Sequence, residues 1–245
     1  MGKHAKHRAL VRLACLLGLL WSGVAQAECR LALILALDVS ASVDAAEYDL
    51  QRLGLAAALD SADVRAAILE GAPGDVALAV YEWSGHYQQK LHLDWTLLRS
   101  HGDIDRAVLA LGQMKRSHDN FPTSVGQALA YGASVMERSP ACTRRVIDMS
   151  GDGVNNYGFR PGNAYRHFPF RDVVVNGLVI LGDDPDVFAF YLSEVLHGPG
   201  AFLETANGFA DFRNAMTRKL LREISDIMLG AVHNPPGIAE AGPHG

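Results

Sequence analysis

The chain has 245 residues, of which 49% are hydrophobic, and its formal net charge at pH 7 is −5. This length and composition are typical of a folded protein with a substantial hydrophobic core, and they exclude a disordered or fibrous chain. The acidic balance lacks the basic surface that nucleic-acid binding needs, so we expect no nucleic-acid partner.

The first 27 residues have the three parts of a secretory signal peptide. A basic start is followed by an apolar stretch at residues 13–24 and by the small-residue cleavage site Ala25-Gln26-Ala27. The basic residues are Lys3, Lys6, Arg8 and Arg12. Cleavage removes four of the 22 basic residues and no acid, which leaves 218 residues with a net charge of −9. We expect an exported protein, periplasmic or secreted, with no transmembrane segment in the mature chain; an uncleaved anchor is the alternative.

Strand-like and helix-like segments alternate along residues 28–230, which we interpret as a single domain. Apolar or alternating runs predict strands at residues 31–37, 75–83, 86–95, 144–149, 173–181 and 201–205. Helical periodicity predicts helices at residues 43–59, 103–114, 124–138, 186–196 and 209–229, with a short helix near Ala164. Leu50, Leu53 and Ala57 share one face of the first helix. Inward positions of the last helix are Phe212, Met216, Leu220, Ile224 and Ile227. Residues 231–245 are expected to be a disordered tail.

The alternation predicts an α/β fold of the Rossmann-like, doubly wound kind. Its sheet would have six mostly parallel strands, with one antiparallel edge strand at residues 86–95 and helices on both faces. In such open sheets, ligand sites lie beyond the carboxyl ends of the strands, at the place where the strand order reverses.

Oxygen-bearing side chains follow two of the predicted central strands. Asp38, Ser40 and Ser42 come directly after the first strand, and Asp152 follows the fourth. Alternate residues of an extended segment point the same way, so Asp-x-Ser-x-Ser can direct a carboxylate and two hydroxyls at one point. Thr123, just before a predicted helix, supplies a third hydroxyl. Such ligands suit a hard divalent cation, Mg²⁺ foremost and otherwise Mn²⁺ or Ca²⁺, whereas zinc prefers His and Cys.

In this order and setting, the five residues resemble the metal-ion-dependent adhesion site of von Willebrand factor type A domains. The segments Tyr81-Glu-Trp-Ser-Gly85, 150–156 and 198–202 are similar to a bacterial subfamily of unknown function, the DUF1194 proteins. The likeness covers residues 29–229. It implies that the five residues contact the metal directly or through water, and that an open coordination position accepts a carboxylate from a partner protein. The alternative for Asp-x-Ser-x-Ser alone is a turn that begins a helix.

The resemblance therefore implies a non-enzymatic interaction module that binds an acidic residue of a protein partner through the cation. One alternative is a metal-dependent hydrolase, which needs a general base near the metal, with Asp148, Asp44 or Glu82 as candidates. Another is a scaffold in an envelope assembly that the cation only stiffens. Asp148 lies inside a strand, where a buried role competes with a role beside the metal.

Two further groups of residues have local interpretations. Asp44 and Glu47 are expected to stabilise the start of a helix, as acids do near a helix N-terminus. The acidic run at residues 183–186 is expected to cap the following helix, and a calcium site is the alternative.

The mature chain contains two cysteines, Cys29 and Cys142, each a few residues before a strand that leads to a metal aspartate. If those strands are neighbours, the cysteines meet at the opposite end of the sheet, and an oxidising compartment would join them. Such a disulfide would close a loop of about 110 residues and stabilise the fold by about 4 kcal/mol. Two free buried thiols are the alternative.

Overall fold

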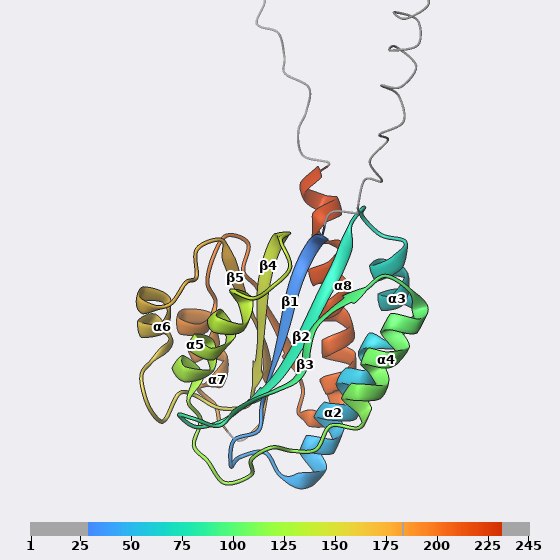
Figure 1. The fold of residues 1–245 in the computed structure, drawn as a ribbon. Helices are drawn as coiled ribbons and strands as arrows, with labels where there is room; N and C mark the ends of the chain where they lie inside the picture. The colour runs from blue at the N-terminus through green and yellow to red at the C-terminus, as the bar shows by residue number, and fades with distance from the viewer. Residues whose placement is uncertain (1–28, 183, 232–245) are drawn as a thin grey trace, which may run out of the picture.

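The centre of the fold is β1 (Cys29–Asp38), whose ten side chains are all buried, as expected for a strand covered on both faces. The computed structural model describes residues 29–182 and 184–231 (Figure 1). The predicted signal, the tail from residue 232 and the side chain of Ile227 lie outside the described residues. Within these ranges, we find no helix with the length and apolar character needed to cross a membrane.

The sheet has six strands in the order β3-β2-β1-β4-β5-β6. The strands beside β1 are β2 (Asp75–Trp83), β3 (Gln89–Leu98), β4 (Cys142–Gly151), β5 (Val173–Ile180) and β6 (Leu203–Ala206). Only the β2–β3 pair at the edge is antiparallel. The predicted mostly parallel sheet with one antiparallel edge strand is therefore confirmed. The strand order reverses between β1 and β4, because the chain runs outward from β1 through β2 and returns on the other side.

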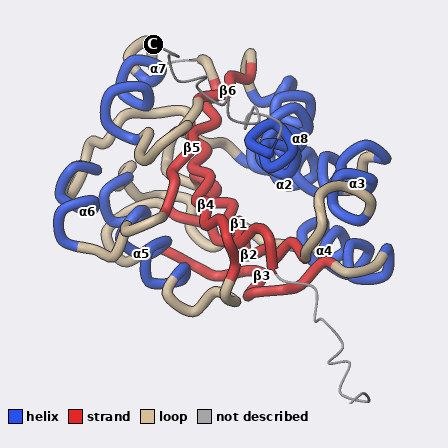
Figure 2. Tube along the Cα trace, turned by 90° about the horizontal axis from the view of Figure 1, so that it is seen from above, coloured by secondary structure: helices blue, strands red, loops and turns tan. Residues whose placement is uncertain are grey.

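Helices cover both faces of the sheet (Figure 2). One face carries α2 (Ala45–Leu59), α3 (Ala62–Leu69), α4 (His101–Gly112) and α8 (Phe212–Ala231). The other carries α5 (Val125–Met136), α6 (Pro161–His167) and α7 (Val187–Phe190), which continues into a π-helical turn, η1 (Tyr191–Val195). A short 3-10 turn, η2 (Phe209–Asp211), leads into α8. The sequence did not predict α3, and it predicted α7 and η1 as one regular helix.

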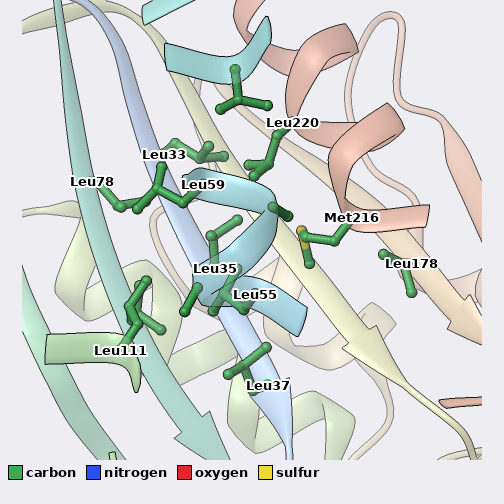
Figure 3. Packing of buried hydrophobic residues seen from close by; sticks show 14 of the residues in the cluster. Leu33, Leu35, Leu37, Leu55, Leu59, Leu78, Leu111, Leu178, Met216 and Leu220 are labelled. Carbon is green, nitrogen blue, oxygen red and sulfur yellow. The ribbon is translucent and has the colours of Figure 1, made fainter. Parts of the chain in front are cut away.

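Successive side chains of β1 point to opposite faces of the sheet, so they alternate between the two helical layers that cover it. Leu33, Leu35 and Leu37 point into the layer with Leu55 of α2 and Leu220 of α8 (Figure 3). The intervening residues of β1 pack against α5 and its neighbours instead. Each fully buried leucine contributes about 1.5–3 kcal/mol to the hydrophobic stabilisation, so β1 is held from both sides.

The apolar stripe predicted on α2 is not the buried one. Leu50 and Leu53 are 46% and 51% exposed, although they share a face with Ala57 as expected. The face of α2 toward the sheet carries Tyr48, Gln51, Leu55, Ala58 and Leu59 instead. Gly54 packs against α8, where an added Cβ would lie 3.1 Å from Cδ1 of Phe212. This close approach turns Leu50 and Leu53 toward solvent.

The amino ends of β1 and β4 are joined by the predicted disulfide. Cys29 and Cys142 are partners in the strand register, with their Cα atoms 4.4 Å apart, and their sulfur atoms are bonded. The bond links residues separated by 113 positions in the chain. It fixes the end of the sheet opposite to Asp38 and Asp152.

Candidate metal centre

The predicted metal ligands lie beyond the carboxyl ends of the two central strands. β1 and β4 are parallel neighbours in which Leu37 lies beside Ser150. Asp38 ends β1, and Asp152 follows the end of β4 directly. Both carboxylates therefore lie at the point where the strand order reverses, which is where open α/β sheets bind their ligands.

The segment after β1 folds into a tight polar turn. The amide of Ser40 donates a hydrogen bond to Oδ1 of Asp38 at 2.8 Å, and the hydroxyls of Ser40 and Ser42 are 3.3 Å apart. Asp38 and Ser40 are fully buried, whereas Ser42 is exposed. One carboxylate and two hydroxyls thus line a turn that opens to solvent at Ser42.

Thr123 and Asp152 complete the same cluster from two other segments. The hydroxyl of Thr123 lies 3.2 Å from that of Ser40, and Ser42 donates to Oδ1 of Asp152 at 2.9 Å. The structure therefore brings all five predicted residues together in one network, although they span 115 positions of the sequence. Their role as cation ligands stays a prediction.

The electrostatics of the cluster fit a cation. Oδ2 of Asp38 is buried and has no hydrogen-bond partner within residues 29–182 and 184–231. Burial, and next the nearby charge of Asp152, raise the pKa of Asp38 to about 8. A buried carboxylate oxygen without a partner is costly, and a bound divalent cation would remove that cost. Two carboxylates with three hydroxyls make the oxygen-only donor set that Mg²⁺, Mn²⁺ or Ca²⁺ prefers.

A half-buried arginine, Arg116, holds the backbone of the first loop. Nη2 of Arg116 donates to the carbonyls of Val39 and Ser40, at 3.1 Å and 3.0 Å. The amide of Ala41 donates to the carbonyl of Phe121 at 2.9 Å. These contacts connect the first loop to the segment that precedes Thr123. No local sequence pattern predicts these contacts, since they join segments about 80 residues apart.

Two asparagines of the loop after β4 fix the segment that carries Thr123. The amide of Thr123 donates to Oδ1 of Asn156 at 2.9 Å, and the amide of Asn156 donates back to the carbonyl of Thr123 at 3.0 Å. The amide of Gly126 donates to Oδ1 of Asn155 at 3.1 Å. The paired asparagines in the segment at residues 150–156 are the one feature that could have pointed to this role.

Asp184 connects the loop after β5 to the loop that carries Asp152. Its Oδ2 accepts from the amide of Val154 at 3.0 Å, and its Oδ1 accepts from the amide of Asp186 at 2.9 Å. The second bond ends at the amide of the N-cap residue of α7, Asp186, and among the described residues no side chain caps this helix, so the expected capping is not found. The first was not predicted, and it restrains the residues next to Asp152. Asp183 lies outside the described residues.

Gly151 is required by a close approach behind Asp152. A Cβ on Gly151 would lie 2.5 Å from the hydroxyl of Tyr191 and 2.9 Å from Oδ2 of Asp38. Tyr191 is fully buried, and this burial raises the pKa of its hydroxyl well above the ordinary value. The neutral phenol hydroxyl of Tyr191 therefore lies behind Gly151, close to the carboxylate of Asp38.

Asp148 belongs to the hydrophobic layer under α8 and not to the metal cluster. It is buried on β4, and its Oδ1 lies 3.2 Å from Nζ of Lys219. Lys219 also pairs with Glu223 at 3.0 Å, and Glu223 accepts from Nδ2 of Asn176 at 2.6 Å. Burial, opposed by Lys219, raises the pKa of Asp148 to about 7. The alternative of a role beside the metal has no support in these contacts.

The other two candidate bases are also engaged elsewhere. Asp44 and Glu47 form a reciprocal capping box at the start of α2, as expected for acids at a helix N-terminus. Glu82 accepts from the hydroxyl of Tyr48 at 2.6 Å and from the amide of Ser117 at 2.8 Å, and it lies 3.0 Å from Nε2 of His92. Burial acts to raise the pKa of Glu82, but these three contacts outweigh it and hold the pKa below its ordinary value.

The sheet order, the covering helices and the position of the cluster define the fold of a von Willebrand factor type A domain. A domain of this type from Catenulispora acidiphila is similar, with a TM-score of 0.57 and 15% identity over 80% of this chain and 43% of that chain. The mussel byssus protein PTMP1, in a form "with zinc occupied MIDAS motif", gives a TM-score of 0.58 and 15% identity over 81% and 48%. The PilB minor pilin from Streptococcus sanguinis gives 0.61 and 11% over 86% and 64%. The chain thus spans less than two thirds of each of these structures.

The family follows from the sequence itself. A family model described as "Protein of unknown function (DUF1194)" matches residues 28–228, so the chain belongs to this family. The comparison with curated proteins finds no match.

Proposed function

We propose that Asp38, Ser40, Ser42, Thr123 and Asp152 bind one divalent cation, Mg²⁺ foremost, and that the exported chain uses it to bind a protein partner. The observation that carries the proposal is the buried Oδ2 of Asp38, which finds no hydrogen-bond partner in the part of the chain that the structure describes and lies near the charge of Asp152. A cation here would supply the missing partner and would offset the repulsion between Asp38 and Asp152.

The ligands of the proposed cation also explain why the partner would supply an acidic residue. Three of the five ligands are neutral hydroxyls, so they add no negative charge around the cation. The cation, when bound, supplies an electrophilic position that an external carboxylate can occupy. Because Ser42 and Asp152 are the more accessible members of the cluster, we expect the carboxylate of a partner protein to approach from their side.

Two observations support export and a binding role. The Cys29–Cys142 disulfide is the kind of bond that persists in oxidising compartments, so it favours a periplasmic or secreted protein. Two of the similar structures are a minor pilin and a byssus thread matrix protein, and the second has a zinc-occupied form of the metal motif. The hydrolase alternative lacks comparable support, because Asp148, Asp44 and Glu82 all contact other groups.

The first experiment is a titration of Mg²⁺, Mn²⁺ and Ca²⁺ into the mature oxidised protein, followed by calorimetry and thermal melting. Asp152→Asn removes one carboxylate of the cluster, and Asp63→Asn, an exposed acid on α3, is the matched control. At a cation concentration 100 times the Kd, the native state gains about 2.7 kcal/mol, which raises the Tm by roughly 5–10 °C for a domain of this size. We expect this gain in wild type and in Asp63→Asn but not in Asp152→Asn. Saturable binding that survives in Asp152→Asn contradicts the assignment.

A second experiment separates a binding module from a stiffened scaffold. Wild-type and Asp152→Asn proteins are immobilised, exposed to envelope proteins in Mg²⁺ and eluted with EDTA. The binding module predicts a protein that is retained by wild type, released by EDTA and not retained by Asp152→Asn. A cation that only raises the Tm, with no EDTA-released protein, supports the scaffold instead.

A further inference from the structure

An apolar groove lies on the outer surface between α2 and the start of α8. Its volume is about 600 Å³. The residues that line its apolar part, called the α2 groove below, are Leu50, Leu53, Ala57, Phe209 and Ala210, with Arg213 at its edge. Single exposed leucines are common on protein surfaces, but two leucines and an aromatic ring around one depression are typical of a binding surface.

The α2 groove follows from how the two helices pack. Gly54 lets α8 approach α2 closely, and Phe212 of α8 lies against this glycine. Leu50 and Leu53 then stand on the outer side of the contact, 46% and 51% exposed. Their apolar spacing continues to Ala57, so three successive positions of one stripe on α2 have no covering element among the described residues.

The α2 groove adjoins the candidate metal centre. A smaller recess of about 110 Å³ is lined by Ser42 and Asp152 of the metal cluster and by Leu181 and Phe209. Phe209 lines both the recess and the α2 groove. A ligand that reaches the cation beside Ser42 and Asp152 can therefore continue past Phe209 onto Leu50 and Leu53.

Arg213 brings a positive charge to the α2 groove. Arg213 is exposed, and within residues 29–182 and 184–231 it makes no ion pair. The charge of Asp49, which also lines the groove, is paired with Arg52 at 2.7 Å. Glu47 lines the smaller recess, where its carboxylate accepts from the amide of Asp44. The groove thus offers apolar contact beside the charge of Arg213, which complements a segment that contains both apolar and acidic residues.

We propose that the α2 groove holds apolar side chains of the same partner segment whose acidic residue binds the cation, with a further acid of that segment near Arg213. This inference rests on the proposed metal-dependent binding, and it specifies the partner as an acidic segment with large aliphatic side chains. The chain's own residues after Ala231 fit less well. Residues 232–245 include Val232 and Ile238 as large aliphatic residues, and Ala231 ends α8 at the opposite end of the helix from its start beside the groove (Figure 1).

The test uses four kinds of fluorescein-labelled synthetic peptide in a Ser/Gly scaffold. The first kind carries one Asp and two Leu residues, the second only the Asp, the third only the two Leu residues, and the fourth none of them. In the first kind, the spacing from the Asp to the Leu residues is varied from two to eight residues. Fluorescence anisotropy measures their affinity for the full mature protein in Mg²⁺ and in EDTA. Leu53→Ser removes part of the groove, and Leu109→Ser is the matched control, because Leu109 on α4 is 59% exposed.

We expect one spacing at which the Asp–Leu peptide binds wild type at least about ten-fold more tightly than the Asp peptide, as burial of one leucine allows. This gain should disappear in Leu53→Ser and persist in Leu109→Ser. If the Leu pair adds nothing at any spacing, or if its gain survives Leu53→Ser, the inference is wrong while the metal-dependent function stands. If no Asp peptide shows Mg²⁺-dependent binding, the proposed function itself fails.

Other occupants give different results. A dimer of wild type that sedimentation detects and Leu53→Ser abolishes would assign the α2 groove to a second copy. Equal, non-additive losses of Tm in Leu53→Ser and Ile238→Ser would assign it to the chain's own tail. Either result overturns the proposal.

Discussion

Lys219 provides a strict test of the charge network beneath α8. Its side chain is fully buried, and its ammonium group lies 3.2 Å from Asp148 and 3.0 Å from Glu223. We consider Lys219→Met, which keeps most of the side-chain volume and removes the charge. The two carboxyl groups would then remain buried together without the ammonium group that pairs with both.

The expected cost is large and depends on pH. Removal of one member of a buried ion pair costs about 3–5 kcal/mol, because the remaining charge is left uncompensated. Protonation can relieve this cost, since burial already raises the pKa of Asp148 to about 7 even with Lys219 present. A carboxyl group with a higher pKa in the folded than in the unfolded chain binds more protons when folded, so its contribution to stability falls as the pH rises. We therefore expect a loss of about 3 kcal/mol at pH 8 and a clearly smaller loss at pH 5.

The assay is urea unfolding of the mature oxidised protein at both pH values, with thermal melting in parallel. At pH 8 the Tm should fall by roughly 6–12 °C, given about 2–4 °C per kcal/mol for a domain of this size. Lys90→Met, an exposed lysine on β3, is the control and should change little. Asp148→Asn combined with Lys219→Met should recover part of the loss. A loss below 1 kcal/mol in Lys219→Met, or one that is equal at both pH values, would refute this account of the network.

Three further predictions concern the disulfide, a buried acid and the metal loops. Reduction of the Cys29–Cys142 bond should lower the free energy of unfolding by about 4 kcal/mol, and urea unfolding with and without reductant would show a much smaller change if the bond were dispensable. Because the pKa of Glu82 is below its ordinary value, its contribution is present above the unfolded pKa and is lost as the pH falls. Glu82→Gln should therefore lose about 2 kcal/mol at pH 7 and less at pH 3.5; equal losses at both pH values would contradict this. Asn156→Ala should weaken cation binding about ten-fold in calorimetry by releasing Thr123, and unchanged affinity would show that Thr123 is held by other contacts.

The meeting of the candidate ligands in one cluster could be predicted because their signals are local. Asp38, Ser40 and Ser42 follow a continuous apolar strand, and Asp152 follows another, so parallel pairing of the two strands alone brings these residues to the same end of the sheet. The disulfide at the amino ends of the same two strands could be predicted for the same reason. Each of these predictions required only that β1 and β4 be neighbours.

The orientation of α2 could not be predicted from its periodicity. Two apolar stripes are present on this helix, and the one with Leu50 and Leu53 is the exposed one. The buried stripe includes Gln51, whose Nε2 donates to the carbonyl of Asp38 at 3.0 Å, so a polar residue lies where apolar patterning would not place it. Which stripe is buried depends on the contact of Gly54 with α8, which is far away in the sequence.

The residues that hold the metal loops were likewise beyond local patterns. Arg116, Asn156 and Asp184 act through backbone groups of segments distant in the chain. Side chains of these types occur in many loops, and only the assembled fold gives them partners. An arginine that donates to backbone carbonyls, as Arg116 does, has no sequence pattern of its own.

These supporting contacts bear on whether the cation is structural or is used for binding. Arg116, Asn156 and Asp184 hold the three loops through protein hydrogen bonds, so a cation would not be the only support of the loops. A bound cation would also change the charge state of the cluster, where Oδ2 of Asp38 has no hydrogen-bond partner among the described residues. A cation bound at this solvent-accessible cluster would compensate the negative charge of Asp38 and Asp152. Its remaining coordination position would then be open to a carboxylate of another protein. On the proposal that the cluster binds a cation, these protein contacts to all three loops favour binding of a partner over stiffening of a scaffold.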